Sequence, residues 1–487
     1  MNNLVDYIRS DCSIVLPNGE LLYPHEIHTY KNFYKNELYN KLQGKTVGKV
    51  ALIWSNNLDV ILPAVKAMWE LGIAISVHDF NVDVVTHPLF ANFYKHIDII
   101  IGSPDADSVL PHIPHINALE TKMDYPAYTS EMSQKEIFQL TATDYPDIEF
   151  QLDSVISGDT VCCVTHTSGT TGEPKIVKTT HRVAIDLVKE NIKLFEFNSQ
   201  DIVIHHKTLH HGSLFLNYAI PAFVMTNQHH WVLQKNKERD SEFLERCLVK
   251  CQLDQITKWL LAYKLISKLS NQSFNKSYNL SNTSLITVVG PEQKEMQSLF
   301  DKYNPIAVYN NFGCTEIGTL VVSKTQAGTV NDYYPNKFTK FNSLIDFEIF
   351  PTFFKAKFKG TDDWQTIGDI VNITDGTFVW EGRNTFLVAG QQKINIFAIE
   401  RWTKDYLNTT SFSVVPDFEA NLLYLAIFDT TLNTIQLEEI NRALKKSDIL
   451  QSCVFSKLEF IEYATVAMGV KPSQPVLLYY FRGKNLE

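Results

Sequence analysis

The 487-residue chain has few cysteines, and their spacing is irregular. The seven are Cys12, Cys162, Cys163, Cys247, Cys251, Cys314 and Cys453. An odd number without a regular spacing does not predict a disulfide framework and fits a reducing compartment. Cys247 and Cys251 form a C-x3-C pair, but no second pair or nearby histidine completes a zinc site. We interpret both as ordinary thiols on a helix.

Long apolar runs are also missing. No segment approaches the roughly 18 apolar residues of a membrane span. The first twelve residues carry Asp6 and Asp11 and have no apolar run, so we expect no signal peptide here. A formal net charge of -10 is unfavourable for binding nucleic acid or an anionic membrane. We therefore expect a cytoplasmic protein with no nucleic-acid and no membrane partner.

The chain does contain enough apolar residues, 45 %, to build a sizeable core, and its length predicts at least two domains. Lys49–Trp54 and Ile73–Val77 are short apolar runs, and between them Leu58–Trp69 has helical periodicity. This order predicts a β-α-β unit and hence a parallel sheet covered by helices. Further strands are expected at 97–101, 161–165, 202–205, 285–289 and 306–309, and helices at 182–195 and at 291–303, with Pro291 in its first turn.

The last hundred residues have a different pattern. Short strands and helices are expected at 397–407, 412–415, 422–428, 437–446 and 454–462. The predicted fold is therefore α/β, with a large N-terminal domain of parallel and mixed sheets (residues 1–383). A small, mobile α+β C-terminal domain (residues 384–487) follows a hinge at 384–385.

The most informative motif follows the strand expected at 161–165. It reads Thr167-Ser168-Gly169-Thr170-Thr171-Gly172-Glu173-Pro174-Lys175. Glycines allow backbone N–H groups to turn toward an anion, hydroxyls donate further hydrogen bonds, and Lys175 adds positive charge. The Walker type of loop, G-x-x-x-x-G-K-[ST], does not fit this string. The motif predicts a polyphosphate site formed by Thr167, Ser168, Gly169, Thr170, Thr171, Gly172 and Lys175.

This string resembles the first signature of the adenylate-forming (AMP-binding) superfamily, T-S-G-T-T-G-x-P-K. That superfamily includes acyl-CoA synthetases, adenylation domains of peptide synthetases and luciferase-like enzymes. The resemblance continues in order along most of the chain. It implies an enzyme that uses ATP and Mg²⁺ to convert a carboxylic acid into an acyl-AMP.

A second segment, residues 310–316, resembles the superfamily motif N-x-Y-G-x-T-E. It contains Asn310, Asn311, Phe312, Gly313, Cys314, Thr315 and Glu316. Glu316 supplies a hard oxygen ligand for Mg²⁺, and Thr315 can donate to the α-phosphate. Phe312 replaces the usual tyrosine but keeps an aromatic face for adenine, whose edge Asn310 can pair with.

Three shorter matches complete the nucleotide site. Gly290, Pro291 and Glu292 occupy the place of an adenine-contacting turn, although a helix start explains Gly-Pro equally well. Ile367-Gly368-Asp369 resembles T-G-D, which implies that Asp369 holds the ribose hydroxyls. Arg383 matches the arginine at the domain hinge, which also reaches the ribose.

A histidine-rich segment stands where acyl-CoA synthetases often have His-x-x-Gly. His210, His211 and Gly212 are expected to line the acyl pocket, and His205 and His206 precede them. Members that activate amino acids usually carry an aspartate here, but no Asp occurs between Lys207 and Thr226. The resemblance therefore favours a carboxylic acid that is not an α-amino acid.

The C-terminal motifs depart most from the superfamily pattern. A catalytic lysine usually follows a glycine directly, but here one residue separates Gly469 from Lys471. We take Lys471 as the catalytic candidate, ahead of Lys484. The expected catalytic residues are thus Lys471, His210 and Thr315. The leading hypothesis is an acid–thiol ligase with coenzyme A as acceptor; transfer to the phosphopantetheine of a separate carrier protein or to an amine, and a catalytically weak nucleotide-binding protein, stay open.

Overall fold

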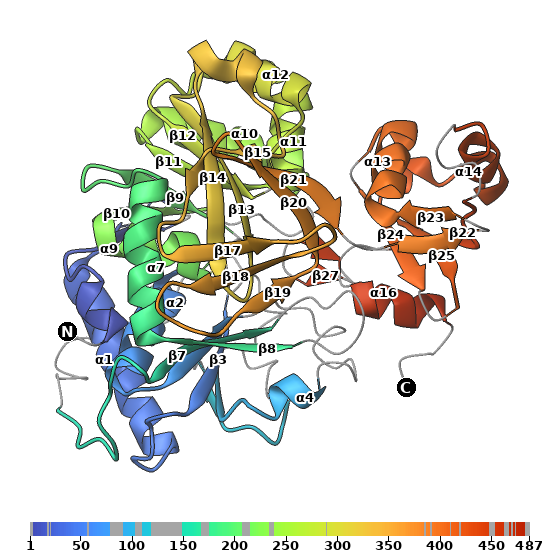
Figure 1. Ribbon diagram of the computed structural model, residues 1–487. Helices are drawn as coiled ribbons and strands as arrows, with labels where there is room; N and C mark the ends of the chain where they lie inside the picture. The colour runs from blue at the N-terminus through green and yellow to red at the C-terminus, as the bar shows by residue number, and fades with distance from the viewer. Residues whose placement is uncertain are drawn as a thin grey trace. The chain divides into compact units, whose positions relative to one another are not determined.

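The computed structural model of the chain (Figure 1) describes residues 3–16, 19, 21–55, 58–77, 91–102, 110–117, 149–166, 175–206, 215–232, 238–288, 290–383, 386–389, 392–409, 411–417, 420–447, 453–461, 467–468, 471–472 and 474–482. Two compact units divide the chain. The first is formed by Met1–Phe80, Phe93–Thr167 and Ile176–Ile345, and the second by Asn81–Asn92, Ser168–Lys175 and Asp346–Glu487. The division after Ile345 falls upstream of the hinge expected at 384–385, and that hinge stays a prediction.

A six-stranded sheet in the first unit has the strand order β6-β5-β3-β4-β7-β8. Its strands are β3 (Val50–Trp54), β4 (Ala74–Val77), β5 (Ile99–Gly102), β6 (His115–Asn117), β7 (Val161–His166) and β8 (Ile176–Thr180). Neighbours are parallel except β7 and β8, which are antiparallel. The expected β-α-β unit is confirmed, since helix α2 (Leu58–Glu70) connects the parallel strands β3 and β4.

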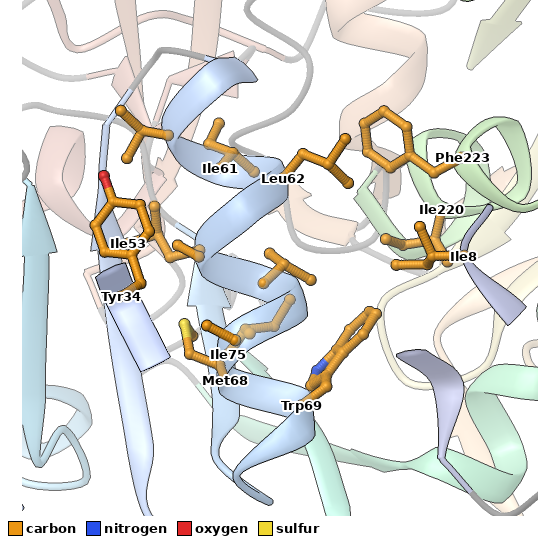
Figure 2. Close-up of a cluster of buried hydrophobic side chains, with 14 of the residues drawn as sticks. Ile8, Tyr34, Ile53, Ile61, Leu62, Met68, Trp69, Ile75, Ile220 and Phe223 are labelled. Carbon is orange, nitrogen blue, oxygen red and sulfur yellow. The ribbon is translucent and has the colours of Figure 1, made fainter. Parts of the chain in front are cut away.

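Helix α2 is buried on nearly all sides because its sequence is almost continuously apolar. Figure 2 shows its side chains among those of other segments, with Ile61, Leu62, Met68 and Trp69 of the helix near Ile8, Tyr34, Ile53, Ile75, Ile220 and Phe223. The Trp69 indole donates a hydrogen bond to the Cys162 carbonyl at 2.9 Å. Cys162 lies at an irregularity in the β7–β8 pairing, between Val161 and Cys163. The indole therefore satisfies a backbone oxygen at the irregular position.

A nine-stranded sheet in the same unit has the order β16-β14-β13-β12-β11-β9-β10-β1-β2. Its strands are β1 (Ser13–Val15), β2 (Leu21–Leu22), β9 (Ile202–His205), β10 (Gln228–Trp231), β11 (Lys258–Ala262), β12 (Ser284–Val288), β13 (Ala307–Cys314), β14 (Gly318–Thr325) and β16 (Lys340–Phe341), and β15 (Lys337–Phe338) precedes β16 along the chain. The six adjacent strands β13, β12, β11, β9, β10 and β1 are parallel to one another. The outer strands β2, β14 and β16 pair antiparallel with their neighbours. The carboxyl ends of β9, β11, β12 and β13 therefore meet at one edge, where α/β proteins bind ligands.

Several helices accompany these sheets. They are η1 (Leu4–Tyr7), α1 (Pro24–Lys41), α4 (Ala91–Tyr94), α7 (His181–Leu194), the π-helical η4 (Phe215–Ala219), α9 (Ile220–Met225), α10 (Asp240–Leu253), α11 (Tyr263–Asn271), α12 (Gln293–Tyr303) and η5 (Ala327–Asp332). One apolar core joins side chains of α10, α11 and α12 to strands such as β11 and β12. Within the described ranges, no helix combines the length and the apolar character that a bilayer crossing needs.

Helix α12 corrects the prediction that Pro291 lies in its first turn. The helix begins at Gln293, and Glu292 is its N-cap with extended φ and ψ of -62° and 160°. The Glu292 N–H donates to the Glu295 carboxylate at 2.9 Å. Pro291 is held outside the helix because its carbonyl accepts a hydrogen bond from the Tyr333 hydroxyl at 2.8 Å.

The second unit is built mostly from antiparallel strands and a small helical region. Its elements are β17 (Ile345–Ile349, which begins at the division), β18 (Phe354–Phe358), β19 (Gln365–Ile367), β20 (Asp369–Thr374), β21 (Thr377–Arg383), β22 (Phe386–Ala389), β23 (Gln392–Asn395), α13 (Ile396–Leu407), β24 (Phe412–Asp417), β25 (Leu422–Ile427), η6 (Thr430–Leu432), α14 (Leu437–Leu444), β26 (Lys457–Phe460), β27 (Ala467–Met468), β28 (Lys471–Pro472) and α16 (Gln474–Phe481). A separate apolar core includes Ile399, Val414, Leu425 and Ile440. The mixed α/β class expected from the sequence is confirmed.

Candidate active site

The turn after β12 lies directly beside the end of β13. The two strands are parallel, with Thr287 opposite Asn310 and Val288 opposite Asn311. Asn310 and Asn311 are both buried, at 0 % and 5 % exposure. The structure therefore brings Gly290 together with Asn310, two positions that the sequence assigned to one nucleotide site.

Gly290 has no room for a side chain. A Cβ at this position would lie 2.1 Å from Tyr333 Oη and 2.6 Å from Asn310 Nδ2. The Asn310 Nδ2 donates to the Pro335 carbonyl at 2.9 Å. In the described part of the chain, Asn310 Oδ1 has no hydrogen-bond partner. The result is a buried amide whose acceptor oxygen has no hydrogen bond among the described residues.

The turn between β13 and β14 contains Thr315 and Glu316. The strands pair antiparallel up to Cys314 opposite Gly318, with a register shift between Phe312 and Gly313. A Cβ at Gly313 would lie 2.3 Å from the Gly318 carbonyl oxygen, so a close backbone approach requires glycine there. Thr315 and Glu316 are half-buried. They follow the buried asparagines by only a few residues.

Two neighbours determine the character of this turn. Phe312 is half-buried, and its ring lies 5.9 Å from that of Phe338. Burial raises the pKa of the Cys314 thiol, and the adjacent Glu316 carboxylate acts in the same direction. A neutral thiol is a poor ligand for Mg²⁺, whereas the Glu316 carboxylate offers a hard oxygen of the kind that this ion prefers.

The expected phosphate loop joins β7 to β8. These strands are antiparallel, with Thr165 opposite Val177 and His166 opposite Ile176, so the pairing closes both ends of the loop. Residues 167–174 lie outside the described residues. Lys175 is described, and it is exposed immediately before β8.

Histidines gather on the neighbouring strands β9 and β10. His205 Nε2 and His229 Nδ1 are 3.1 Å apart, and His206 Nε2 lies 2.6 Å from the Leu260 carbonyl oxygen. Burial lowers the pKa of His229 to about 3 and holds the pKa of His205 well below its ordinary value. His205 and His229 are therefore neutral core groups. No cluster of three or more His, Cys, Asp or Glu side chains able to hold a metal occurs in the part of the chain that the structure describes; His210, His211 and Gly212 lie outside it.

The second unit brings two further predicted residues together. Asp369 on β20 stands opposite Arg383 on the antiparallel strand β21. Asp369 is 8 % exposed, and one carboxylate oxygen accepts from the Trp380 indole at 2.9 Å. The Arg383 side chain is outside the described atoms. A buried carboxylate held by an indole can accept further hydrogen bonds with its remaining lone pairs.

Lys471 lies on β28, where its backbone pairs with Met468 of β27. Gly469 and Val470 stand between the two strands in the sequence and lie outside the described residues. Helix α16 follows, and Arg482 directly after it donates to Asp417 of β24, including an Nε–Oδ2 hydrogen bond of 2.7 Å. Asp417 is buried, with 1 % side-chain exposure. The segment that follows Lys471 is thus anchored to the sheet of β24 and β25, whereas Lys484 lies outside the described residues.

Three residues that hold the site were missed by sequence reasoning: Tyr333, Pro335 and Trp380. The Tyr333 hydroxyl donates to the carbonyl of Pro291, 42 positions away, and the Pro335 carbonyl accepts from Asn310, 25 positions away. No local pattern indicates such a contact. Trp380 gives a weak signal, because β20 and β21 form a hairpin and its two strands must pair.

The sequence model of the family described as "AMP-binding enzyme" matches residues 95–339. A long-chain-fatty-acid–CoA ligase, ACSBG2 of Xenopus laevis, is 28 % identical over 170 residues. That match spans 31 % of this chain and 22 % of the relative, so the aligned part is about a fifth of the relative's length.

Solved structures share the fold over almost the whole chain. ATP-bound MatB from Rhodopseudomonas palustris has a TM-score of 0.71 at 14 % identity, covering 99 % of both chains. The O-succinylbenzoate coenzyme A synthetase MenE from Bacillus subtilis, in complex with ATP and magnesium ion, has a TM-score of 0.68 at 14 % identity. It covers 95 % of this chain and 96 % of its own. At these identities the likeness establishes the fold.

Proposed function

The chain belongs to the AMP-binding enzyme family, and we propose that it activates a carboxylic acid with ATP to form an acyl-AMP and pyrophosphate. The observation that carries the proposal is the joint position of Gly290 and Asn310 at the ends of adjacent parallel strands. Thr315 and Glu316 follow in the next turn. These residues come from two separate signatures and lie together in the first unit.

The base of the nucleotide would be bound by neutral groups. Asn310 Oδ1 is a buried acceptor suited to the exocyclic amine of adenine. The turn of Gly290, Pro291 and Glu292 would border the base, and the Phe312 ring would pack against it. Asn311 and Gly313 would complete this surface through the backbone.

The phosphates would be bound by residues 167–172 with Lys175, and Thr315 would donate to the α-phosphate. The Glu316 carboxylate would hold a magnesium ion, for which a hard oxygen ligand is suited. Bound there, Mg²⁺ would neutralise phosphate charge. Asp369 and Arg383 would hold the ribose hydroxyls, since a carboxylate accepts from a diol.

In the proposed reaction a substrate carboxylate oxygen attacks the α-phosphorus in line. A new C–O–P linkage forms, the bond from the α-phosphorus to the bridging oxygen breaks, and pyrophosphate leaves with the electron pair. A carboxylate needs no general base, so positioning and electrostatics lower the barrier. Lys471 would stabilise the charge that builds on the bridging oxygen.

The acyl group would then pass to a thiol, with coenzyme A as the proposed acceptor. The Xenopus laevis relative is named as a CoA ligase and MenE as a coenzyme A synthetase, and these two names support the choice. His210, His211 and Gly212 would border the acyl pocket. The absence of Asp between Lys207 and Thr226 favours an acid without an α-ammonium group.

The test is ATP–pyrophosphate exchange over a mixed panel of carboxylic acids, with and without coenzyme A. We expect acid-dependent exchange, and AMP release only when coenzyme A is present. Glu316→Gln should lower exchange about 100-fold or more, because an anionic ligand beside the phosphates is lost. The matched control Asp332→Asn removes an exposed carboxylate of the same unit and should change little.

The outcomes separate the alternatives. If AMP is released only in the presence of a carrier protein or an amine, that molecule is the acceptor in place of coenzyme A. ATP binding without exchange for any acid would favour the catalytically weak nucleotide-binding protein. Lys471→Ala should retain ATP binding and lose exchange, whereas full activity would move the catalytic role to Lys484 or Lys393.

A further inference from the structure

We propose that Tyr333 and the Pro335 carbonyl determine which purine the site accepts, by fixing the orientation of the Asn310 amide; this rests on the proposed binding of ATP at Asn310. A primary amide has one acceptor end and one donor end, and the two can exchange by rotation about the terminal bond. The end that faces a ligand therefore has to be set by another group. In this chain the Pro335 carbonyl is that group.

The orientation follows from what a carbonyl can do. The Pro335 oxygen lies 2.9 Å from Asn310 Nδ2 and can only accept a hydrogen bond. The opposite orientation would place two acceptor oxygens against each other in a buried site, because Asn310 is fully buried. The amide therefore keeps its NH₂ toward Pro335 and its Oδ1 on the opposite side. Oδ1 has no hydrogen-bond partner among the described residues.

Pro335 is in turn positioned through Tyr333. The Tyr333 hydroxyl donates to the Pro291 carbonyl at 2.8 Å, and its side chain is buried, with the residue 4 % exposed. This hydrogen bond ties the segment that carries Pro335 to the turn after β12. Gly290 permits the arrangement, since a Cβ there would collide with both Tyr333 Oη and Asn310 Nδ2. Tyr333 is thus a positioning residue that does not itself need to touch the nucleotide.

The chemical consequence is a choice between a 6-amino and a 6-oxo purine. A fixed acceptor pairs with the exocyclic amine of adenine, but it faces the carbonyl oxygen of hypoxanthine without a proton between them. A buried polar group left in this state is costly, so the site rejects the analogue. ATP and inosine triphosphate (ITP) differ in this respect and have the same sugar and phosphates.

The experiment measures the dissociation constants of ATP and ITP by calorimetry for the wild type, Tyr333→Phe and Tyr334→Phe. Tyr334 is the matched control, because it is 45 % exposed and its ring lies 3.9 Å from Lys337 Nζ rather than in the turn. The wild type should prefer ATP roughly 10- to 100-fold, the range expected when one buried hydrogen bond is exchanged for two facing acceptors. Tyr333→Phe should weaken ATP binding severalfold and ITP binding less, so that the ATP/ITP ratio falls. Tyr334→Phe should leave the ratio unchanged.

A purely structural role for Tyr333 would give a different result. It would weaken both nucleotides equally, or lower only the melting temperature, and the unchanged ratio would overturn the inference. Asn310→Leu removes the acceptor at similar volume and should abolish the preference even if Tyr333→Phe folds poorly. If the wild type binds ATP and ITP equally, only the inference on purine selection is overturned. If it binds neither nucleotide, the proposed function is overturned as well.

Discussion

Asn310 in the first unit and Asp369 in the second are both buried polar residues on strands, but they are held in different ways. The neutral Asn310 donates to a backbone carbonyl, that of Pro335. The acidic Asp369 accepts from a side chain, the Trp380 indole. A backbone partner persists whatever residue stands there, whereas a side-chain partner is lost with one substitution. The contact of Asn310 is therefore best disturbed by adding a side chain that crowds it. The contact of Asp369 is best disturbed by removing the indole N–H.

The largest effect should come from a buried carboxylate that has a charged partner. Arg482→Met would remove the ion pair of Asp417, whose side chain is 1 % exposed and still accepts from the Ala420 N–H. Removing one partner of a buried pair costs up to about 3–5 kcal/mol. We expect an early unfolding transition in calorimetry of the full chain and a loss of exchange activity, because α16 follows the hairpin of Lys471. Arg401→Met, at an exposed position of the same unit, is the control. Equal melting curves for the two variants would show that the ion pair contributes little.

Crowding the first unit should have the next largest effect. Gly290→Ala places a Cβ 2.1 Å from Tyr333 Oη and 2.6 Å from Asn310 Nδ2, and overpacking of this kind costs about 1–3 kcal/mol. Denaturant unfolding should detect the loss, together with weaker ATP binding. At Gly328 a Cβ meets nothing within 4 Å, so Gly328→Ala is the matched control. A Gly290→Ala protein as stable as the control would mean that the turn after β12 yields easily.

The smallest effect is expected at Asp369. Trp380→Phe removes the indole N–H but keeps an aromatic ring, at a cost of about 1–2 kcal/mol for a lost hydrogen bond to a carboxylate. The KM for ATP should rise severalfold while kcat changes little. Trp364→Phe, in the same unit and beside Lys357, serves as the control. An unchanged KM would remove Trp380 from the nucleotide site.

These contrasts explain what could be predicted from the sequence. The parallel strands were predictable because they are short apolar runs, as at Val50–Trp54 and Ile202–His205. Gly313 belonged to a recognisable motif because a close backbone approach admits only glycine there. Residues whose type is required by such local structure can be recognised from a single sequence.

The rest depended on distant contacts. The start of α12 was wrong by two residues because Pro291 is bound by Tyr333, 42 positions later. Pro335 could not have been identified, since its contribution is a carbonyl that every residue has. Trp380 acts through a pairing of strands whose register has an irregularity between Ile370 and Val371. A hydrophobic pattern does not encode any of these three contacts.

The Trp69–Cys162 hydrogen bond gives α2 a role in setting the register of β7. A strand that slips by one residue turns every side chain to the opposite face, and the pairing of β7 with β8 is irregular at Cys162. The indole engages the carbonyl of Cys162, 93 positions from Trp69. Helix α2 thereby helps to fix the register of β7, the strand that ends at His166, directly before the hydroxyl-rich segment in the sequence.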